Sequence, residues 1–230
     1  MISSPGSPFV WLRYCLQCCI RCSRWLSVLL WWLSWPLFAG NLSSEILHKV
    51  ELEYGQPGLQ RVARWEQLIW DIRYLATEQQ LKEVNDFFNT LRFRTDQDHW
   101  QQADYWATPV ETLASNGGDC EDFAIAKYFT LRQLGVPARN MRITYVKALK
   151  INEPHMVLTY YPKRGEPLVL DILVSELLPA SRRTDLLPVY SFNADGLWQS
   201  KNRNEESLLG SADEIAMWRN LKQRLGMDTL

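Results

Sequence analysis

Apolar residues recur every three or four positions between residues 59 and 75, which is the spacing of one face of an amphipathic helix. A second stripe follows within residues 77–91, and Thr77 with Gln80 three positions later predicts a capping box at its start. The apolar positions of the two stripes are Leu59, Val62, Trp65, Leu68, Ile69, Ile72 and Leu75, then Leu81, Val84, Phe87, Phe88 and Leu91. Two helices are therefore expected before residue 92.

Two more helices are predicted further along the chain. Residues 120–134 repeat apolar side chains at helical spacing, and Gly135 with Pro137 marks the end of this helix. The last helix is expected to start at Ser211, with Glu214 completing a capping box. Its apolar stripe, which includes Trp218, is expected to pack onto the rest of the domain.

Short runs rich in β-branched and aromatic residues lie between the third and the last helix and predict strands. These runs are residues 143–146, 155–161, 168–173, 189–192 and 197–198, separated by turn-forming stretches at 152–154 and 162–165. Helices come first and strands follow without strand–helix alternation, so we expect an α+β fold with an antiparallel sheet.

Residues 1–40 differ from the rest of the chain. They contain no Asp or Glu, carry Arg13, Arg21 and Arg24, and continue through an uncharged run, residues 25–38, that is followed by the small residues Ala39 and Gly40. This order is typical of a secretory signal peptide, and the run is shorter than the roughly 20 residues of a membrane-spanning helix. We expect export and a single domain over residues 41–230, although Leu37 is large for a cleavage site. A retained N-terminal membrane segment therefore stays open as an alternative.

Four cysteines of this leader have the spacing C-x-x-C-C-x-x-C, from Cys15 to Cys22. No histidine flanks them, so we do not interpret them as a zinc site. If the leader is removed, Cys120 is the only thiol of the remaining chain.

The overall charge bears on partners. The 25 Lys and Arg nearly cancel the 26 Asp and Glu, and 47% of the residues are hydrophobic. This balance is that of a globular protein without a basic surface for a polyphosphate backbone, so nucleic-acid binding is not expected.

Cys120 is the first candidate for chemistry. It follows Gly117 and Gly118 at the predicted start of a helix, where the helix dipole favours a thiolate over a thiol. A buried, inert cysteine is the alternative, but Asp119 and Glu121 on either side make a poor setting for a core side chain.

His155 and Asp171 lie on two strand-like runs. A carboxylate within the apolar sequence around Asp171 needs a partner, and a histidine on a neighbouring strand would provide one. A cysteine on a helix with a histidine and an aspartate on strands is the papain-like arrangement, in which the histidine accepts the thiol proton and the aspartate orients the imidazole. His99 is the competing histidine, and we expect it to lie in an exposed loop.

Asp119, Glu121 and Asp122 place three carboxylates within four residues beside Cys120. Hard oxygen ligands at this density suit Ca²⁺. A helix start enriched in acids to complement the dipole is the alternative. Three anions would raise the thiol pKa, however, and a bound cation would cancel that effect.

Several motifs occur in one order: Asp104-Tyr-Trp-Ala-Thr-Pro, Gly117-Gly-Asp-Cys-Glu-Asp-Phe-Ala, Thr144-Tyr-Val-Lys-Ala, His155-Met-Val-Leu, Leu168-Val-Leu-Asp and Pro188-Val-Tyr-Ser-Phe-Asn. Over residues 84–198 the chain resembles the LapG-type bacterial transglutaminase-like cysteine proteinases. This resemblance implies a papain/transglutaminase-like core. It also implies Cys120 as nucleophile, His155 as general base and then acid, Asp171 as its orienter, and Ca²⁺ on Asp119 and Glu121.

The resemblance also implies a biological role. Members of the family are periplasmic, and they cut large surface adhesins near the adhesin N-terminus after a pair of alanines, which releases cells from a biofilm. An inner-membrane receptor of cyclic di-GMP sequesters them. Acyl transfer to an amine and a calcium-modulated binding domain without catalysis stay open as alternatives. A cut between small residues implies a narrow groove, for which Trp106 or Tyr105 are candidate walls unless they belong to the core.

Overall fold

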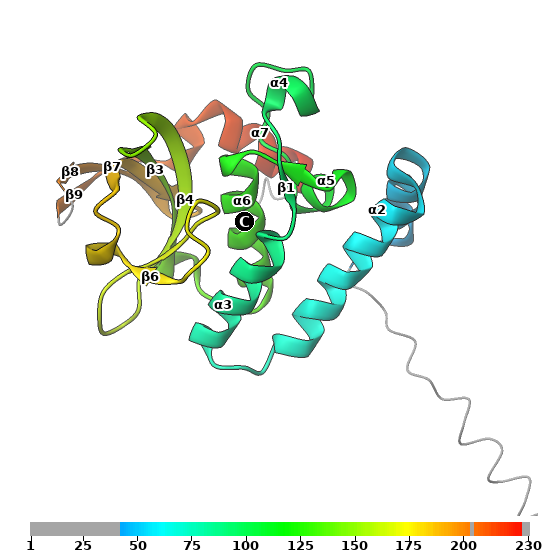
Figure 1. The fold of residues 1–230 in the computed structure, drawn as a ribbon, viewed down its shortest axis with the longest axis horizontal. Helices are drawn as coiled ribbons and strands as arrows, with labels where there is room; N and C mark the ends of the chain where they lie inside the picture. The colour runs from blue at the N-terminus through cyan, green and yellow to red at the C-terminus, as the bar shows by residue number, and fades with distance from the viewer. Residues whose placement is uncertain (1–41, 203–204, 227–230) are drawn as a thin grey trace, which may run out of the picture. The chain divides into compact units, whose positions relative to one another are not determined.

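A seven-stranded antiparallel sheet with helices packed against one of its faces forms the fold (Figure 1). The computed structural model describes residues 42–202 and 205–226. The signal peptide or membrane segment expected over residues 1–40, with its four cysteines, lies outside the described residues. Within the described ranges, no helix combines the length and the apolar character that crossing a membrane requires.

The helices carry the numbers used in Figure 1. They are α2 (Ser44–Ile72), α3 (Thr77–Phe88), α4 (Asp96–His99), α5 (Pro109–Ser115), α6 (Cys120–Gln133) and α7 (Ala216–Arg224), with short 3₁₀ turns η1 (Ala138–Asn140), η2 (Ala180–Arg182) and η3 (Ala212–Glu214).

The strands of the large sheet are β3 (Met141–Ala148), β4 (Glu153–Tyr160), β5 (Leu168–Leu170), β6 (Leu178–Pro179), β7 (Leu186–Asn193), β8 (Gly196–Asn202) and β9 (Glu205–Gly210), in the order β6-β5-β4-β3-β7-β8-β9. Two more strands, β1 (Arg92–Phe93) and β2 (Gly117–Gly118), form a short parallel pair. The α+β fold and the antiparallel sheet are thereby confirmed.

The first helix is longer than its apolar stripe predicts. α2 begins at Ser44, where the Ser43 hydroxyl accepts a hydrogen bond from the backbone of Ile46, and it ends at Ile72 rather than Leu75. The helix bends at Gly55, whose φ of 65° is not helical. The residues before this bend were missed because few of them are buried.

Both predicted capping boxes are wrong. α3 is capped by Ala76 without a side-chain hydrogen bond, and the Gln80 side chain instead donates to the backbone oxygens of Ile72 and Arg73. Those carbonyls end α2 and have no helical partner, so they attract a nearby amide. At the other end, Ser211 caps the η3 turn, and α7 starts only at Ala216.

Helix α6 lies in the centre of the helical layer. It contacts β4 and β3 on one side and α3 and α5 on the other, which is why nearly every side chain from Asp122 to Thr130 is buried. The helix expected over residues 120–134 is confirmed; it ends at Gln133, and Leu134 is its C-cap. Two of its buried polar residues have partners, since the Lys127 Nζ donates to Asn89 Oδ1 at 2.8 Å and the Trp65 ring N–H donates to Thr130 at 2.8 Å.

The sheet has two buried faces. Ile143, Leu158 and Leu170 face the helices and join the main core, whereas Val146, Val157 and Val169 pack together on the opposite face. The expected strands agree with β3, β4, β5, β7 and β8, although β6 and β9 were not predicted. Strand β6 has only two residues, too few for a period of two to be visible.

Helix α7 packs onto the domain as expected. Trp218 and Leu221 belong to the main core. Arg224 reaches the Tyr105 hydroxyl in the segment before α5 at 2.7 Å, and Glu111 Oε2 in the first turn of α5 at 2.8 Å.

Candidate active site and carboxylate cluster

Cys120 is the first residue of α6, as its sequence context predicts. The two preceding glycines allow a close approach. A Cβ at Gly117 would overlap the backbone oxygen of Arg92, and a Cβ at Gly118 would overlap the Asp122 carboxylate. The β1–β2 pairing therefore fits tightly under the start of α6.

The thiol of Cys120 donates to Glu121 Oε2 at 3.0 Å. Burial raises its pKa, and the negative charge of Glu121 raises it further. A hydrogen bond from the backbone of Met156 acts in the opposite direction. Because Met156 follows His155 on β4, this contact places the sulfur against the strand that carries the histidine.

His155 and Asp171 form a buried pair. His155 Nε2 lies 2.6 Å from Asp171 Oδ1, and the two side chains are 5% and 0% exposed. Asp171 directly follows β5, which pairs with β4. Burial alone would raise the pKa of Asp171, but hydrogen bonds from His155 and Arg183 hold it at about 2. The carboxylate is therefore ionised over the whole physiological pH range.

Asp171 has further partners that sequence reasoning missed. The guanidinium of Arg183 donates to Asp171 Oδ2 at 2.6 Å, and Asn89 Nδ2 donates to the backbone oxygen of Asp171 at 2.8 Å. Neither residue stands in a pattern that points to the site, since Arg183 is one of two adjacent arginines after a short turn.

His99 is not an exposed loop residue, contrary to expectation. It ends α4, is partly buried, and its Nε2 lies 2.8 Å from the Ser115 hydroxyl. Burial lowers its pKa. The hydrogen bond to Ser115 joins His99 to α5.

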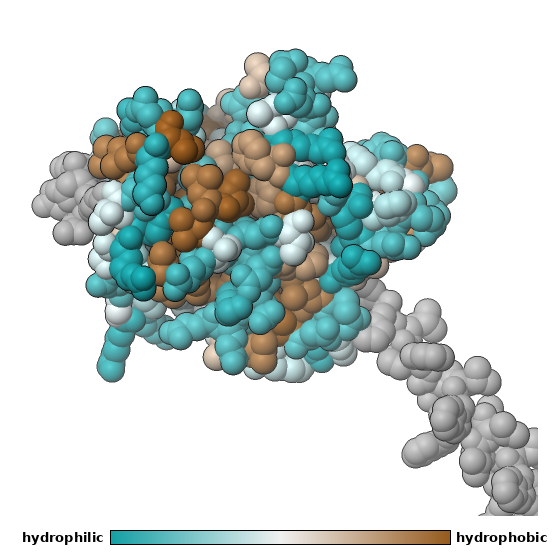
Figure 2. Space-filling model, in the orientation of Figure 1, coloured by the Kyte–Doolittle hydropathy of each residue, from teal (hydrophilic) through white to brown (hydrophobic). Residues whose placement is uncertain are grey.

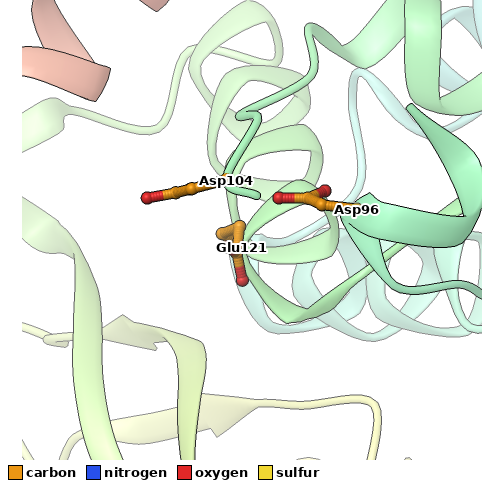
Figure 3. A group of neighbouring side chains, drawn as sticks. All are labelled: Asp96, Asp104 and Glu121. Carbon is orange, nitrogen blue, oxygen red and sulfur yellow. The ribbon is translucent and has the colours of Figure 1, made fainter. Parts of the chain in front are cut away.

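A cluster of five carboxylates lies beside Cys120: Asp96, Asp104, Asp119, Glu121 and Asp122. Carboxylate oxygens of Asp96, Asp104 and Glu121 lie within 4.8 Å of one another, and so do those of Asp96, Asp119 and Asp122. Figure 3 shows the first of these groups, with side chains that come from α4, from the segment before α5, and from α6.

The electrostatics of this cluster are unfavourable as it stands. Burial raises the pKa of Asp96 to about 6 and that of Asp119 to about 10, and neighbouring carboxylates add to the shift at Asp119. The pKa of Asp122 is raised well above its usual value, again first by burial. Among the described side chains, no Lys or Arg pairs with any of the five carboxylates.

The donor set fits a calcium ion. Asp96, Asp119 and Asp122 each bury one carboxylate oxygen that has no hydrogen-bond partner within the described part of the chain. Buried oxygens without a donor are costly, and a divalent cation would satisfy all three together. Asp119 and Glu121, the two expected ligands, belong to this cluster, and Asp96, Asp104 and Asp122 extend it.

Asp96 and Asp104 could not be assigned from the sequence. They precede Cys120 by 24 and 16 positions in a polar stretch without periodicity. The β1–β2 pair brings this stretch to the start of α6, and two backbone amides fix the carboxylates: Tyr105 N donates to Asp96 at 2.6 Å and Ala107 N donates to Asp122 at 2.7 Å.

Trp106 and Tyr105, the two candidate walls of a substrate groove, make contacts within the domain. Trp106 is 4% exposed and stacks on Phe192 with ring centroids 5.5 Å apart, so it belongs to the core. Tyr105 is partly buried, and its hydroxyl donates to Glu111 at 3.0 Å. Trp106 is therefore not a wall of a surface groove.

Comparisons with known proteins agree with this geometry. The family model of the bacterial transglutaminase-like cysteine proteinases (BTLCP) matches residues 72–200. The structure of Legionella pneumophila LapG is 43% identical, with a TM-score of 0.68, over 80% of this chain and 98% of that chain.

Two further structures of the same relative differ in their treatment with calcium. The calcium-bound form is 44% identical, with a TM-score of 0.67, over 80% of this chain and 99% of that chain. The EGTA-treated form is 43% identical, with a TM-score of 0.69, over 80% of this chain and 98% of that chain. A search of curated proteins gave no significant match. The matches in sequence and structure show that the chain belongs to the family of bacterial transglutaminase-like cysteine proteinases.

Proposed function

We propose that this protein is a calcium-dependent cysteine endopeptidase in which Cys120 is the nucleophile, His155 the general base and acid, and Asp171 the residue that orients His155. The observation that carries this proposal is the 2.6 Å contact between His155 on β4 and Asp171, which directly follows the paired strand β5. His155 is next to Met156, whose backbone contacts the Cys120 sulfur. A nucleophile, a base and a group that orients the base are the components of such a site.

The proposed reaction has two halves. Nε2 of His155 is engaged by Asp171, so Nδ1 accepts the thiol proton as the sulfur attacks the scissile carbonyl carbon. Backbone N–H groups at the start of α6 stabilise the negative oxygen of the tetrahedral intermediate. His155 then gives its proton to the leaving amine, and a thioester remains. In the second half, water loses a proton to His155 and attacks the thioester, which releases the carboxylic acid product and restores the thiol.

Asp119 and Glu121, with Asp96, Asp104 and Asp122, would hold the calcium ion. Its positive charge would compensate the carboxylates that now raise the pKa of the thiol. Glu121 matters most, because it accepts the hydrogen bond of the thiol in this structure. With Glu121 engaged as a metal ligand, its carboxylate would compete less for the thiol hydrogen, and the thiol could turn toward His155.

We further propose the substrate and compartment that the family resemblance implies. The substrate is a large surface adhesin, cut near its N-terminus after a pair of alanines, and the cut promotes biofilm dispersal. On the face seen in Figure 2, apolar side chains gather over the region of β4 and α6, which suits a segment with small apolar residues. The leader pattern supports export to the periplasm, and an inner-membrane receptor of cyclic di-GMP is the proposed regulator.

A cleavage assay tests the reaction. The purified protein is incubated with an N-terminal adhesin fragment that contains an Ala-Ala site, in Ca²⁺ or in chelator, beside the Cys120→Ala variant. We expect two fragments only with both calcium and the thiol. Mass spectrometry would reveal cross-linked species if the protein transfers the acyl group to an amine. A folded sample that binds Ca²⁺ without cutting or cross-linking would contradict both enzymatic functions.

Fractionation tests the compartment. We expect the protein in the periplasmic fraction with a new N-terminus near residue 40. An intact N-terminus in the membrane fraction would show that the leader is retained as an anchor.

A further inference from the structure

Arg183 is a buried cation attached to the pair that the mechanism uses. It follows the η2 turn, and its side chain is 2% exposed. Its Nη2 donates to Asp171 Oδ2 at 2.6 Å. Its Nε and Nη2 also contact the two carboxylate oxygens of Asp185 at 3.0 and 2.9 Å. The guanidinium of Arg183 therefore bridges the carboxylates of Asp171 and Asp185, and the Asp171 carboxylate is hydrogen-bonded to His155.

The hydrogen bonds of Asp171 divide between its two oxygens. Oδ1 accepts from His155 at 2.6 Å and from the backbone amides of Ile172 and Leu173 at 2.6 and 3.1 Å. Oδ2 accepts from Arg183. The two amides belong to the same loop as Asp171 and move with it. Among the described residues, Arg183 is therefore, besides His155 itself, the side chain from outside this loop that hydrogen-bonds the carboxylate and can fix its rotation.

We propose that Arg183 is a positioning residue of the protease site: it holds the Asp171 carboxylate in the rotation that presents Oδ1 to His155, and Asp185 in turn holds Arg183. This inference rests on the proposed function of Cys120, His155 and Asp171. Arg183 acts through Asp171 and is not proposed to touch the substrate.

The chemistry of the side chain suits this role. A guanidinium is planar and presents several N–H groups in a fixed fork, so it can orient two carboxylates together. A lysine in its place would keep the charge and lose the fork. Lys127 from α6 is the other cation near Asp171, but its Nζ bonds Asn89 Oδ1 at 2.8 Å and does not contact the carboxylate.

A cavity gives access to this arginine. A space of about 890 Å³ lies on the face of the sheet opposite α6, and Arg183 lines it together with residues such as Val157, Val169 and Leu186. A small soluble cation such as methylguanidinium can therefore approach the position of the guanidinium if the side chain is truncated.

The experiment compares five proteins in the calcium-supported cleavage assay: the wild type, Arg183→Met, Arg183→Lys, Asp185→Asn, and Arg182→Met as the matched control. Arg182 is the exposed neighbour of Arg183. We expect Arg183→Met to lower kcat by about 10- to 100-fold with KM nearly unchanged. This is the effect typical of removing a residue that orients a metal ligand, and Arg183 orients Asp171 in the same way. Arg183→Lys and Asp185→Asn should be intermediate, and Arg182→Met should match the wild type.

Two readouts separate positioning from a merely structural role. Two additional variants, Arg183→Ala and Arg182→Ala, serve the first readout: millimolar methylguanidinium should restore part of the kcat of Arg183→Ala and leave that of Arg182→Ala unchanged. The ring nitrogen resonances of His155 should also shift in Arg183→Met, because the hydrogen bond at Nε2 depends on the rotation of Asp171. Circular dichroism and thermal unfolding report whether each variant folds. If Arg183→Met does not fold, Asp185→Asn carries the test, because it loosens the guanidinium and leaves its charge in place.

The outcomes distinguish this inference from the proposed function. A wild-type protein that cleaves, with Arg183→Met or a folded Asp185→Asn equally active, overturns the positioning role alone. A folded wild type that cleaves nothing overturns the proposed protease activity. In that case the His155 resonances still test the contact, and unchanged resonances in Arg183→Met would refute it.

Discussion

At the scale of single residues, the site contrasts two ways of burying a carboxylate. Asp171 is buried among donors, and its pKa is held at about 2. Asp96, Asp119 and Asp122 are buried among other acids, each with one oxygen that lacks a partner within the described residues, and their pKa values are raised. The same chemical group is thus stabilised as an anion in one place and needs a cation in the other.

Asp171 leads to a prediction about acid stability. Its pKa is about 2 in the folded protein against an ordinary value of 3.8, so the unfolded chain binds more protons between these values. The contribution of Asp171 is therefore complete above about pH 4 and is lost as the pH falls toward 2, a loss of about 2 kcal/mol. Urea unfolding from pH 6 to 2 should show a loss larger by this amount in the wild type than in Asp171→Asn. Equal losses in the two proteins would contradict the assignment.

Cys120 leads to a prediction about reactivity. Burial raises the pKa of the thiol, and the adjacent Glu121 carboxylate raises it further, so the ion-free protein should hold little thiolate. Alkylation of Cys120 by iodoacetamide at pH 8 should be about tenfold faster in Ca²⁺ than in chelator, since one pKa unit changes the thiolate fraction tenfold.

Glu121→Gln is the matched control for that measurement. In chelator it should react faster than the wild type, because the anion beside the sulfur is gone. A rate that responds to neither Ca²⁺ nor this substitution would show that Glu121 does not control the thiol.

At the scale of elements, the short β1–β2 pair is decisive. It joins Arg92 to Gly117 and Phe93 to Gly118, and so carries the segment with Asp96 and Asp104 to the start of α6. A ladder of two residues per strand adds little stability, but it sets the position of the carboxylates.

Gly118→Ala tests this element. A Cβ there would displace the Asp122 carboxylate and Cβ, so we expect calcium to bind roughly 10- to 100-fold more weakly, with a loss of stability of about 1–3 kcal/mol. Calorimetric titration with Ca²⁺ and urea unfolding in chelator measure the two effects. Gly165→Ala is the control, since Gly165 has a φ of +100° and no close neighbour: it should cost stability and leave calcium affinity unchanged. Unchanged calcium affinity in Gly118→Ala would remove Asp122 from the cluster.

At the scale of the whole molecule, the fold gathers charges that are distant in sequence. The carboxylates come from residues 96–122, and the His155–Asp171–Arg183 network comes from the sheet and the turn before β7. Cys120, the first residue of α6, contacts both groups. Its thiol donates a hydrogen bond to Glu121, and its sulfur also contacts the backbone of Met156, which is next to His155. The carboxylate cluster and the His155–Asp171 pair therefore meet at one sulfur.

This arrangement predicts a pH-dependent response to calcium. The raised pKa values of Asp96 and Asp119, about 6 and about 10, mean that the folded ion-free protein binds more protons than the unfolded chain above pH 4. Its stability should fall as the pH rises from 5 to 8. Calcium at 100 times its Kd should add about 2.7 kcal/mol and raise Tm by roughly 5–10 °C at pH 8.

Calcium should also bind more weakly at pH 5 than at pH 8, because protons compete for the ligands. Calorimetry at both values measures this, and Asp96→Asn is the control, with weaker binding and a smaller pH dependence. An affinity that is the same at both pH values would mean that these carboxylates are already ionised without the metal.

The sequence by itself determined the α+β order of elements, the helix that begins at Cys120 and the candidates Cys120, His155 and Asp171, because each depends on local periodicity or on a residue that is unusual where it stands. Only the tertiary structure decided that Asp96, Asp104 and Arg183 join the site and that Trp106 belongs to the core. Those assignments depend on strand pairing and on contacts between distant segments. Such contacts leave no periodic signal in the chain, and their energy exists only once the segments have come together.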